Sequence, residues 1–145
     1  MTTLRGLVAA VATVLALGLG LVGAGTAAAA PAPQVITLHP GGNPGQRVDA
    51  AVDHGHGTIT VLQRFLIEPS QLTVAWVNLR TGAAGSTGLP DRVAPANPLD
   101  YPDRGAVLRT GTGPVALVVY GPFPPQTGLI PTPSYILPIP HLLTV

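Results

Sequence analysis

The sequence predicts an all-β protein, built as an antiparallel β-sandwich of about seven short strands. Two observations support this class. Short segments alternate between apolar and polar side chains, which is the pattern of half-buried strands. Glycine or proline recurs every few positions between these segments, and beyond residue 30 no window has the i, i+3, i+4, i+7 spacing of an amphipathic helix. Short strands with glycine turns between them are typical of sandwiches and barrels.

The alternation places the strands along the chain. They are expected at 35–38, 47–52, 58–65, 72–79, 83–89, 106–109 and 115–120. Trp76, the only tryptophan, shares the apolar face of its strand with Val74, so we expect it at the centre of the core. Its replacement by alanine would then cost about 3–5 kcal/mol. The run that contains Leu117 and Val119 is apolar on both faces, which predicts a central, buried strand.

Glycine and proline predict where these strands end. Segments 53–57 and 110–114 are expected to join neighbouring strands as hairpins. Gly82 can supply the left-handed residue that a three-residue hairpin loop requires. Pro114 and Pro122 are expected to bracket the central strand, because proline cannot donate to the ladder of a sheet interior.

Two segments fit the strand pattern less well. Segment 90–105 contains four prolines and the triplet Pro-Asp-Arg twice, which predicts a long loop of turns. Segment 121–145 has seven prolines and no acidic residue or arginine, and it is too apolar for a disordered tail. Proline confines it to polyproline or edge-strand conformations. We expect it either to cover an open sheet edge or to present an apolar surface to a lipid-rich envelope or a partner subunit.

Residues 1–29 have the layout of a secretory signal peptide, which would form a helix until it is cleaved. Arg5 is the only charged residue of this stretch, and small and apolar side chains follow it. The alternative is an uncleaved membrane anchor, because about 20 apolar residues can span a bilayer. The glycines and the alanine run at the end of the stretch favour cleavage.

The expected cleavage site lies in the alanine run. Signal peptidase requires small side chains before the cut, and a cut after Ala30 would leave Pro31 where its ring obstructs the protease. We therefore expect the cut after Ala29. The mature chain, 30–145, is then long enough for a single β-sandwich domain.

Composition narrows the range of partners. The chain has no cysteine, so packing alone must hold the mature domain without disulfides. Charged residues make up 9% of the chain, against about 25% in a typical protein. Beyond residue 30, six arginines balance six acidic residues. A phosphate-binding protein needs an excess of positive charge. Nucleic acid is therefore not expected as a partner, and neither is a membrane after signal cleavage.

The chain resembles small secreted proteins of unknown function from mycobacteria and related actinobacteria. The likeness is carried by the alanine-rich leader and by the segments 73–82 (TVAWVNLRTG) and 112–120 (TGPVALVVY). The complete lack of lysine agrees with a GC-rich genome. Many of these proteins are immunoglobulin-like sandwiches, so the resemblance implies that fold and an extracellular or cell-envelope location. It implies no active site.

His54 and His56, with Asp53 beside them, are the candidates for a metal site. Two imidazoles at positions i and i+2 can share one ion, and a neighbouring carboxylate can add an oxygen. A zinc site needs three or four fixed ligands, whereas this pair falls in a glycine-rich hairpin. His39 or His141 would have to complete the site. A solvated turn is the competing interpretation.

Other catalytic or metal chemistry has less support. The remaining candidates are Asp91, Asp100 and Asp103, and the serines Ser70, Ser86 and Ser134. The spacing of the aspartates matches no calcium loop, so capped turns are their expected role. The serines lack the glycine spacing that surrounds a hydrolase nucleophile.

These observations favour an exported, non-enzymatic β-sandwich that works without a cofactor. We expect an extracellular or cell-envelope binding or structural module, whose partner is an envelope component or a protein. Its ligand site is expected in segment 90–105 or 121–145, because long loops carry function on rigid β scaffolds. The alternative is a secreted metal-binding protein or metallohydrolase that uses His54 and His56, and a serine hydrolase is the third possibility.

Overall fold

The computed structural model confirms the all-β class. It describes residues 32–41, 47–66, 68–95, 97–123 and 134–145, which lie within one compact unit, Pro31–Val145. These residues contain no helix and form two antiparallel five-stranded sheets. Accordingly, the described part of the chain has no helix long and apolar enough to cross a membrane. The expected leader helix and the cleavage site at Ala29 and Ala30 lie outside the described residues.

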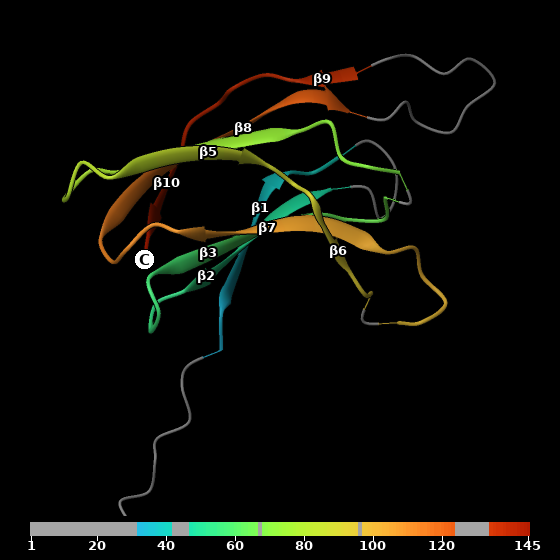
Figure 1. Ribbon diagram of the computed structural model, residues 1–145, viewed down its shortest axis with the longest axis horizontal. Helices are drawn as coiled ribbons and strands as arrows, with labels where there is room; N and C mark the ends of the chain where they lie inside the picture. Colours follow the sequence, from blue (N-terminus) through green and yellow to red (C-terminus); the bar gives the residue numbers. More distant parts are fainter. Residues whose placement is uncertain (1–31, 42–46, 67, 96, 124–133) are drawn as a thin grey trace, which may run out of the picture. The chain divides into compact units, whose positions relative to one another are not determined.

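The sheets form two layers of the unit (Figure 1). The first sheet consists of β1 (Gln34–His39), β2 (Val48–Asp53), β3 (Thr58–Gln63), β7 (Asp103–Arg109) and β6 (Asp91–Val93), in that spatial order. The second has the order β10 (His141–Thr144), β8 (Pro114–Phe123), β4 (Thr73–Asn78) and β5 (Ala84–Gly88), and β9 (Ser134–Ile136) also pairs with β8. The chain changes sheet after β3, after β5 and after β7, so both layers depend on contacts between distant segments.

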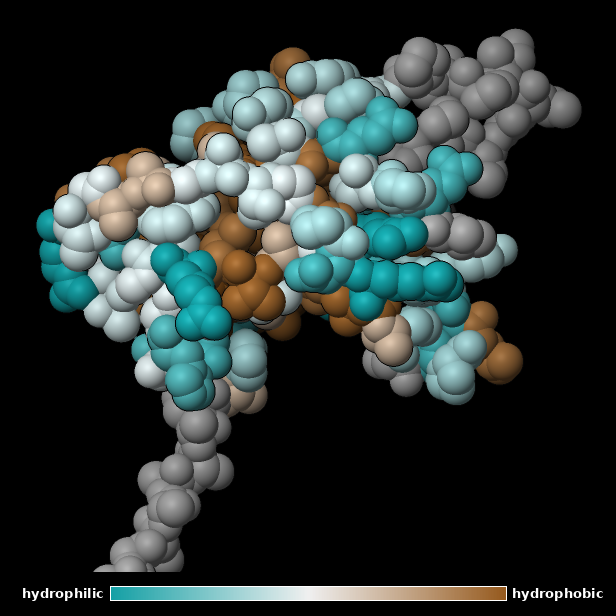
Figure 2. All heavy atoms as spheres, in the orientation of Figure 1, coloured by the Kyte–Doolittle hydropathy of each residue, from teal (hydrophilic) through white to brown (hydrophobic). Residues whose placement is uncertain are grey.

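The core lies between the two sheets, because each strand turns alternate side chains inward. Its members come from both layers and include Val48, Val52, Ile59, Val61, Leu72, Val74, Leu108, Val115, Leu117 and Val119. Figure 2 shows apolar atoms gathered in a band between the layers, with hydrophilic atoms on either side. Val74 and Leu117 are fully buried and Val119 is almost so, as the sequence predicts.

Trp76 is not at the centre of this core, and that prediction is wrong. Its side chain is only partly buried and packs against the core from the side. Across the ladder it is paired with Gly85 on β5, the edge strand. A Cβ at Gly85 would lie 3.0 Å from the indole nitrogen of Trp76, so the indole covers the glycine. The indole thus remains partly exposed beside an edge strand of small residues.

The strand that we predict at 58–65 ends early. β3 stops at Gln63, whose side chain is buried, and Phe65 has a left-handed backbone with φ of 58°. This backbone takes Phe65 out of the alternation, and its N–H donates to a side chain instead of the ladder. The central strand β8, by contrast, runs from Pro114 to Phe123 and contains the two prolines expected to bracket it.

The loop predicted at 90–105 is shorter, because both of its ends join the first sheet. Asp91 and Arg92, from the first Pro-Asp-Arg triplet, lie opposite Gly105 and Arg104 in the β6–β7 ladder. A Cβ at Gly105 would lie 2.7 Å from the end of the Leu62 side chain and 3.0 Å from the Val61 carbonyl oxygen, so a larger residue there would require these neighbours to shift. The repeated triplet therefore forms a strand pair and not two separate turns.

The C-terminal segment covers a sheet edge, as one of its two interpretations predicts. Within the described residues 134–145, β9 and β10 both pair with β8, and β10 forms an edge of the second sheet. Leu143 and Val145 point into the core. The other interpretation also has support, because large apolar side chains of the same segment face solvent.

One end of the unit is locked by a buried amide. Asn78, at the end of β4, donates from Nδ2 to the carbonyl oxygens of Thr110 and Thr112, at 2.9 and 3.1 Å. Its Oδ1 accepts the backbone N–H groups of Arg80 and Thr81. Asn78 thereby ties the β4–β5 turn to the β7–β8 turn. The strands are fixed at this end, and their other ends carry the candidate site.

Candidate functional site

The metal-site candidates form a self-contained turn. Asp53 Oδ1 accepts the N–H groups of Gly55 and His56, and its Oδ2 lies 2.8 Å from His56 Nδ1. The hydrogen bond with His56 is the largest contribution that lowers the pKa of Asp53, and the Gly55 N–H adds to it. Both carboxylate oxygens are thus used within the turn, which is the arrangement of a capped hairpin.

The other histidines are not brought to this turn. Within the described residues no group of three or more His, Cys, Asp or Glu side chains could hold a metal ion. His39 and His141 instead line a separate cavity, described below. Of the four histidines, only His56 has a carboxylate partner in the described part of the chain.

Asp103, Ser70 and Ser134 are engaged by groups that point to no catalytic or metal site. Asp91 lies on β6, and Asp103 begins β7 and is engaged by an arginine and a backbone amide. The Ser70 hydroxyl donates to Gln63 Oε1, and that of Ser134 donates to the Phe123 carbonyl. In the described contacts neither hydroxyl is paired with a histidine, as nucleophilic catalysis would require.

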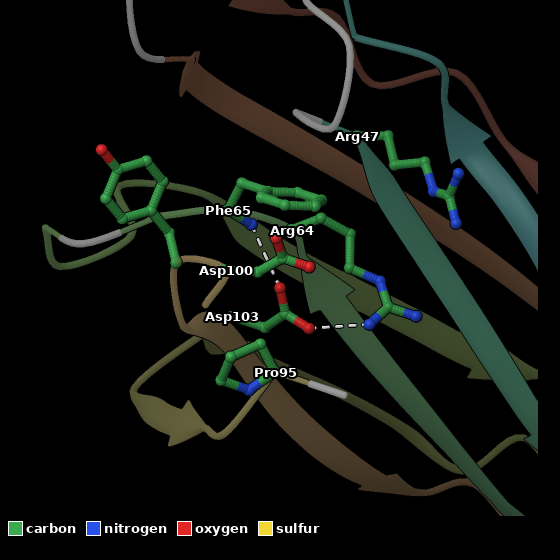
Figure 3. A pocket seen from close by; sticks show the side chains of 7 residues that line it. Arg47, Arg64, Phe65, Pro95, Asp100 and Asp103 are labelled. Carbon is green, nitrogen blue, oxygen red and sulfur yellow. Dashed lines mark hydrogen bonds and ion pairs between the residues drawn. The ribbon is translucent and has the colours of Figure 1, made fainter. Parts of the chain in front are cut away.

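A pocket lies at the end of the first sheet opposite the Asn78 lock. It has a volume of about 410 Å³. Its lining residues come from the start of β2, the end of β3 and the β6–β7 connection: Arg47, Arg64, Phe65, Pro95, Asp100, Tyr101 and Asp103. Figure 3 shows these side chains, with Asp103 near their centre. Segment 90–105 thus contributes to a pocket, and the expectation that it carries a ligand site stays a prediction.

A network of ion pairs forms the floor of this pocket. Arg64 reaches two carboxylates, with Nε 3.0 Å from Asp49 Oδ2 and Nη1 2.7 Å from Asp103 Oδ2. Arg47 Nε lies 2.8 Å from the same oxygen of Asp49, and the Thr37 hydroxyl donates to the other. The side chains of Asp49 and Asp103 are 1% and 5% exposed. Buried charges need such partners, because a lone carboxylate would cost several kcal/mol.

The network sets the ionisation of its members. Burial would raise the pKa of Asp49, but hydrogen bonds from Arg47, Arg64 and Thr37 outweigh it and hold the pKa below its usual value. For Arg64, burial opposes the charge, but the hydrogen bonds that its guanidinium donates to Asp103 and Asp49 raise its pKa. Asp49 and Arg64 are therefore both charged at neutral pH, and the guanidinium of Arg64 is held in position by two carboxylates.

Phe65 connects the network to the pocket wall. Its N–H donates to Asp103 Oδ1 at 3.1 Å, and the next N–H, of Leu66, donates to the Pro102 carbonyl. The left-handed backbone of Phe65 costs about 1–2 kcal/mol for a residue with a side chain. Backbone strain of this kind concentrates at functional sites. Here it directs the phenyl ring to the pocket instead of the core (Figure 3).

The outer wall consists of Pro95, Asp100 and Tyr101. Tyr101 is 59% exposed, and Asp100 is also exposed. The Asp100 carboxylate has no hydrogen-bond or ion-pair partner among the described residues. The pocket thus combines fixed guanidinium donors, a carboxylate open to solvent and aromatic faces. This set can bind a polar ligand, but it contains no nucleophile beside a general base.

A second cavity, of about 340 Å³, lies where the C-terminal segment meets β1 and β8. Leu38, Val119 and Ile136 line it, and His39 and His141 are its polar members. Burial lowers the pKa of His39. The exposed apolar side chains beside it are Tyr135, Leu137, Ile139 and Leu142. The segment is therefore both a cover for the core and an apolar surface.

Sequence reasoning missed the residues of the ion-pair network, except for the segment that holds Asp103. Asp49 lies on the outer face of β2, where it is nevertheless buried by Arg47 and Arg64. The sequence did carry a signal, because charged residues are scarce around the first strands. Histidine aside, Arg47 and Asp49 are the only ones between 31 and 52, and Arg64 is the only one between 54 and 67. Their pairing could not be read from this, since strand register decides it.

Comparison with models of protein families, with curated proteins and with solved structures finds no match to this chain. The class of the protein therefore rests on its own fold and site. It is an all-β protein of two packed antiparallel sheets, with an ion-paired pocket at one end.

Proposed function

We propose that the chain is an exported, non-enzymatic binding module of the immunoglobulin type, which acts outside the cell or on the cell envelope of an actinobacterium. The single observation that carries the binding role is the pocket at the end of the first sheet, with its fixed charges and strained Phe65. Export, envelope location and the kind of organism depend on the leader, the composition and the resemblance to secreted proteins.

Strand order supports the immunoglobulin type. In that fold the two sheets have the orders A-B-E-D and G-F-C, and some members add C′ beside C. Here β2-β3-β7-β6 follows the first order, and β10-β8-β4-β5 follows the second with C′ included. β1 is then an added edge strand. Trp76 lies on β4, the counterpart of strand C, which carries a tryptophan in antibody domains.

The place of the pocket supports a binding role. In immunoglobulin variable domains the B–C loop is one of those that bind ligand at one end of the sandwich. The β3–β4 connection is the counterpart of that loop, and it supplies Phe65. The Asn78 lock holds the opposite end, so the pocket residues stand on a fixed frame. Such a frame reduces the ordering cost of binding.

Export is tested by fractionating cells that express the full chain and by measuring the intact mass of the recovered protein. We expect the chain in the medium or the envelope fraction, with the mass of a polypeptide that begins at Ala30. A full-length chain in the cytosol would overturn the export proposal. A full-length chain in the membrane fraction would show that the leader is kept as an anchor.

The binding role is tested on isolated cell envelopes with the processed protein and two variants. Tyr101→Ala removes an exposed ring from the pocket, and Tyr135→Ala removes an equally exposed ring from the C-terminal segment. We expect Tyr101→Ala to reduce retention on the envelope and Tyr135→Ala to leave it unchanged. Loss of retention in Tyr135→Ala alone would assign envelope binding to the apolar segment and overturn the proposed role of the pocket.

A further inference from the structure

The charges that line the pocket are balanced. The side chains that line the cavity are two arginines, Arg47 and Arg64, and two aspartates, Asp100 and Asp103, so the lining has no formal net charge. The carboxylate of Asp49 lies beneath this lining, where both arginines pair with it. An anionic ligand would meet the carboxylates, and a cationic ligand would meet the guanidinium groups. The site lacks the positive excess that phosphate groups require. A neutral ligand that both donates and accepts hydrogen bonds fits this lining.

The pocket offers both kinds of hydrogen-bonding group. Arg64 uses Nε and Nη1 in the floor network, and Arg47 uses only Nε, so Nη2 of Arg64 and both terminal nitrogens of Arg47 have no partner among the described residues. These groups are donors only. The carboxylate of Asp100 is an acceptor, and it is likewise unpaired in the described part of the chain.

Flat apolar faces stand beside these polar groups. Phe65 and Tyr101 bring aromatic rings from two different connections, and Pro95 adds a third ring. The exposed side chain of Tyr101 combines an apolar ring with a hydroxyl group that can form hydrogen bonds. A ligand with an apolar face and a polar edge therefore matches the two kinds of surface in this lining.

We propose that the pocket binds a neutral saccharide, and this rests on the proposed binding function. A pyranose ring has C–H groups on its faces, which pack on aromatic rings, and hydroxyl groups at its edge, which donate and accept. Hydroxyls would accept from Arg47 and Arg64 and donate to Asp100. A volume of about 410 Å³ lies in the lower part of the range of small-molecule sites, about 300–1,000 Å³, and suits a short saccharide.

The proposal is tested by titrating the processed protein with defined sugars and following binding by calorimetry. The probes are neutral disaccharides of glucose, mannose and galactose, together with digalacturonate as an acidic analogue and a glucosamine dimer as a basic one. We expect at least one neutral disaccharide to bind and the two charged analogues to bind more weakly.

Three variants assign the binding to this pocket. We expect Tyr101→Ala to weaken it about tenfold, because a stacking surface is lost. Asp100→Asn should also weaken it, since one oxygen acceptor is replaced by an amide donor. Tyr135→Ala, whose ring is equally exposed elsewhere, should bind as the wild type does. The unfolding midpoint of each variant checks that the fold is intact.

The inference and the proposed function can fail separately. Binding of charged sugars only, binding that Tyr101→Ala does not change, or no binding of any sugar would overturn the saccharide assignment. Retention on envelopes that still depends on Tyr101 would then leave the binding function standing with another ligand, such as a neutral peptide. If no sugar binds and retention on envelopes does not depend on Tyr101, both proposals are overturned.

Discussion

Trp76 and Leu117 are partners across the β4–β8 ladder, yet Leu117 is fully buried and Trp76 is not. The difference follows from their neighbours on the two edge strands. Both β8 and β4 lie inside the second sheet, but Leu117 has His141 of β10 opposite it, whereas Trp76 has Gly85 of β5. Gly85 of β5 supports the indole but covers little of it.

This relationship predicts an unusual order of mutational effects. Leu117→Ala should reduce the free energy of unfolding by about 2–5 kcal/mol, because it leaves a cavity in the core. Trp76→Ala should reduce it by about 2 kcal/mol, which is less than the loss for Leu117→Ala and less than the 3–5 kcal/mol typical of a fully buried tryptophan. Urea unfolding followed by circular dichroism measures both. A larger loss for Trp76→Ala would place the tryptophan back at the centre of the core.

The C-terminal strand allows a matched pair of substitutions. Leu143 is 5% exposed and Leu142 is 70% exposed, although they are neighbours on β10. Leu143→Ala should lower the free energy of unfolding by about 2–4 kcal/mol, and Leu142→Ala should change it by no more than about 0.5 kcal/mol. Chemical unfolding of the two variants is the measurement. Equal effects would mean that β10 does not cover the core as described.

Acid should weaken the fold through Asp49. The ion-pair network lowers the pKa of this carboxyl, so the folded state binds fewer protons than the unfolded state in acid. Its stabilising contribution is complete above the ordinary pKa of aspartate, about 3.9, and is lost as the pH falls through the lowered value. Stability should therefore fall as the pH is lowered below about 4.

The variant Asp49→Asn tests this assignment. It should be less stable than the wild type at pH 7, and its stability should fall less steeply in acid, because the titrating group is gone. Asp91→Asn changes an exposed carboxyl on β6 and serves as the control, with the profile of the wild type. Free energies of unfolding between pH 2.5 and 7 supply the comparison. Parallel profiles for Asp49→Asn and the wild type would contradict a role for the network in acid stability.

The buried amide of Asn78 should contribute strongly to the free energy of unfolding. Asn78→Leu keeps the size of the side chain but leaves the Thr110 carbonyl and the Arg80 N–H without their partner. Each buried polar group without a hydrogen bond costs about 1–3 kcal/mol, so we expect a loss of about 3 kcal/mol. Thr81→Ala, at the exposed turn beside it, should cost far less. Thermal unfolding distinguishes the two, and a stable Asn78→Leu would show that the turns hold without the amide.

The fold class could be predicted because the signal is local. Alternation of apolar side chains and the glycine turns place β2, β3, β4, β5 and β8 within a few residues of where they lie. β6, β9 and β10 carry no comparable pattern, since they are short or rich in proline and form by pairing with longer strands. The positions of these three strands therefore depend on contacts that exist only in the assembled sheet.

For the candidate site, the sequence predicted one contributing segment but not the residues that pair within it. The proline-rich stretch 90–105 indicated a functional loop, and it supplies Asp100 and Tyr101. The pairing of Arg64 with Asp103, 39 positions apart, follows from the register between β3 and β7. The alternation that predicts a strand over 58–65 gives no sign that the backbone of Phe65 is left-handed.

The chain contains no cysteine, and its locked end carries an open turn between β4 and β5. Ala83 lies exposed in that turn, at the opposite end of the unit from the pocket. Ala83→Cys would give the molecule a single thiol for a fluorophore or a spin label, or for immobilisation on a sensor chip. A label or a surface attached there would leave the pocket open to ligand.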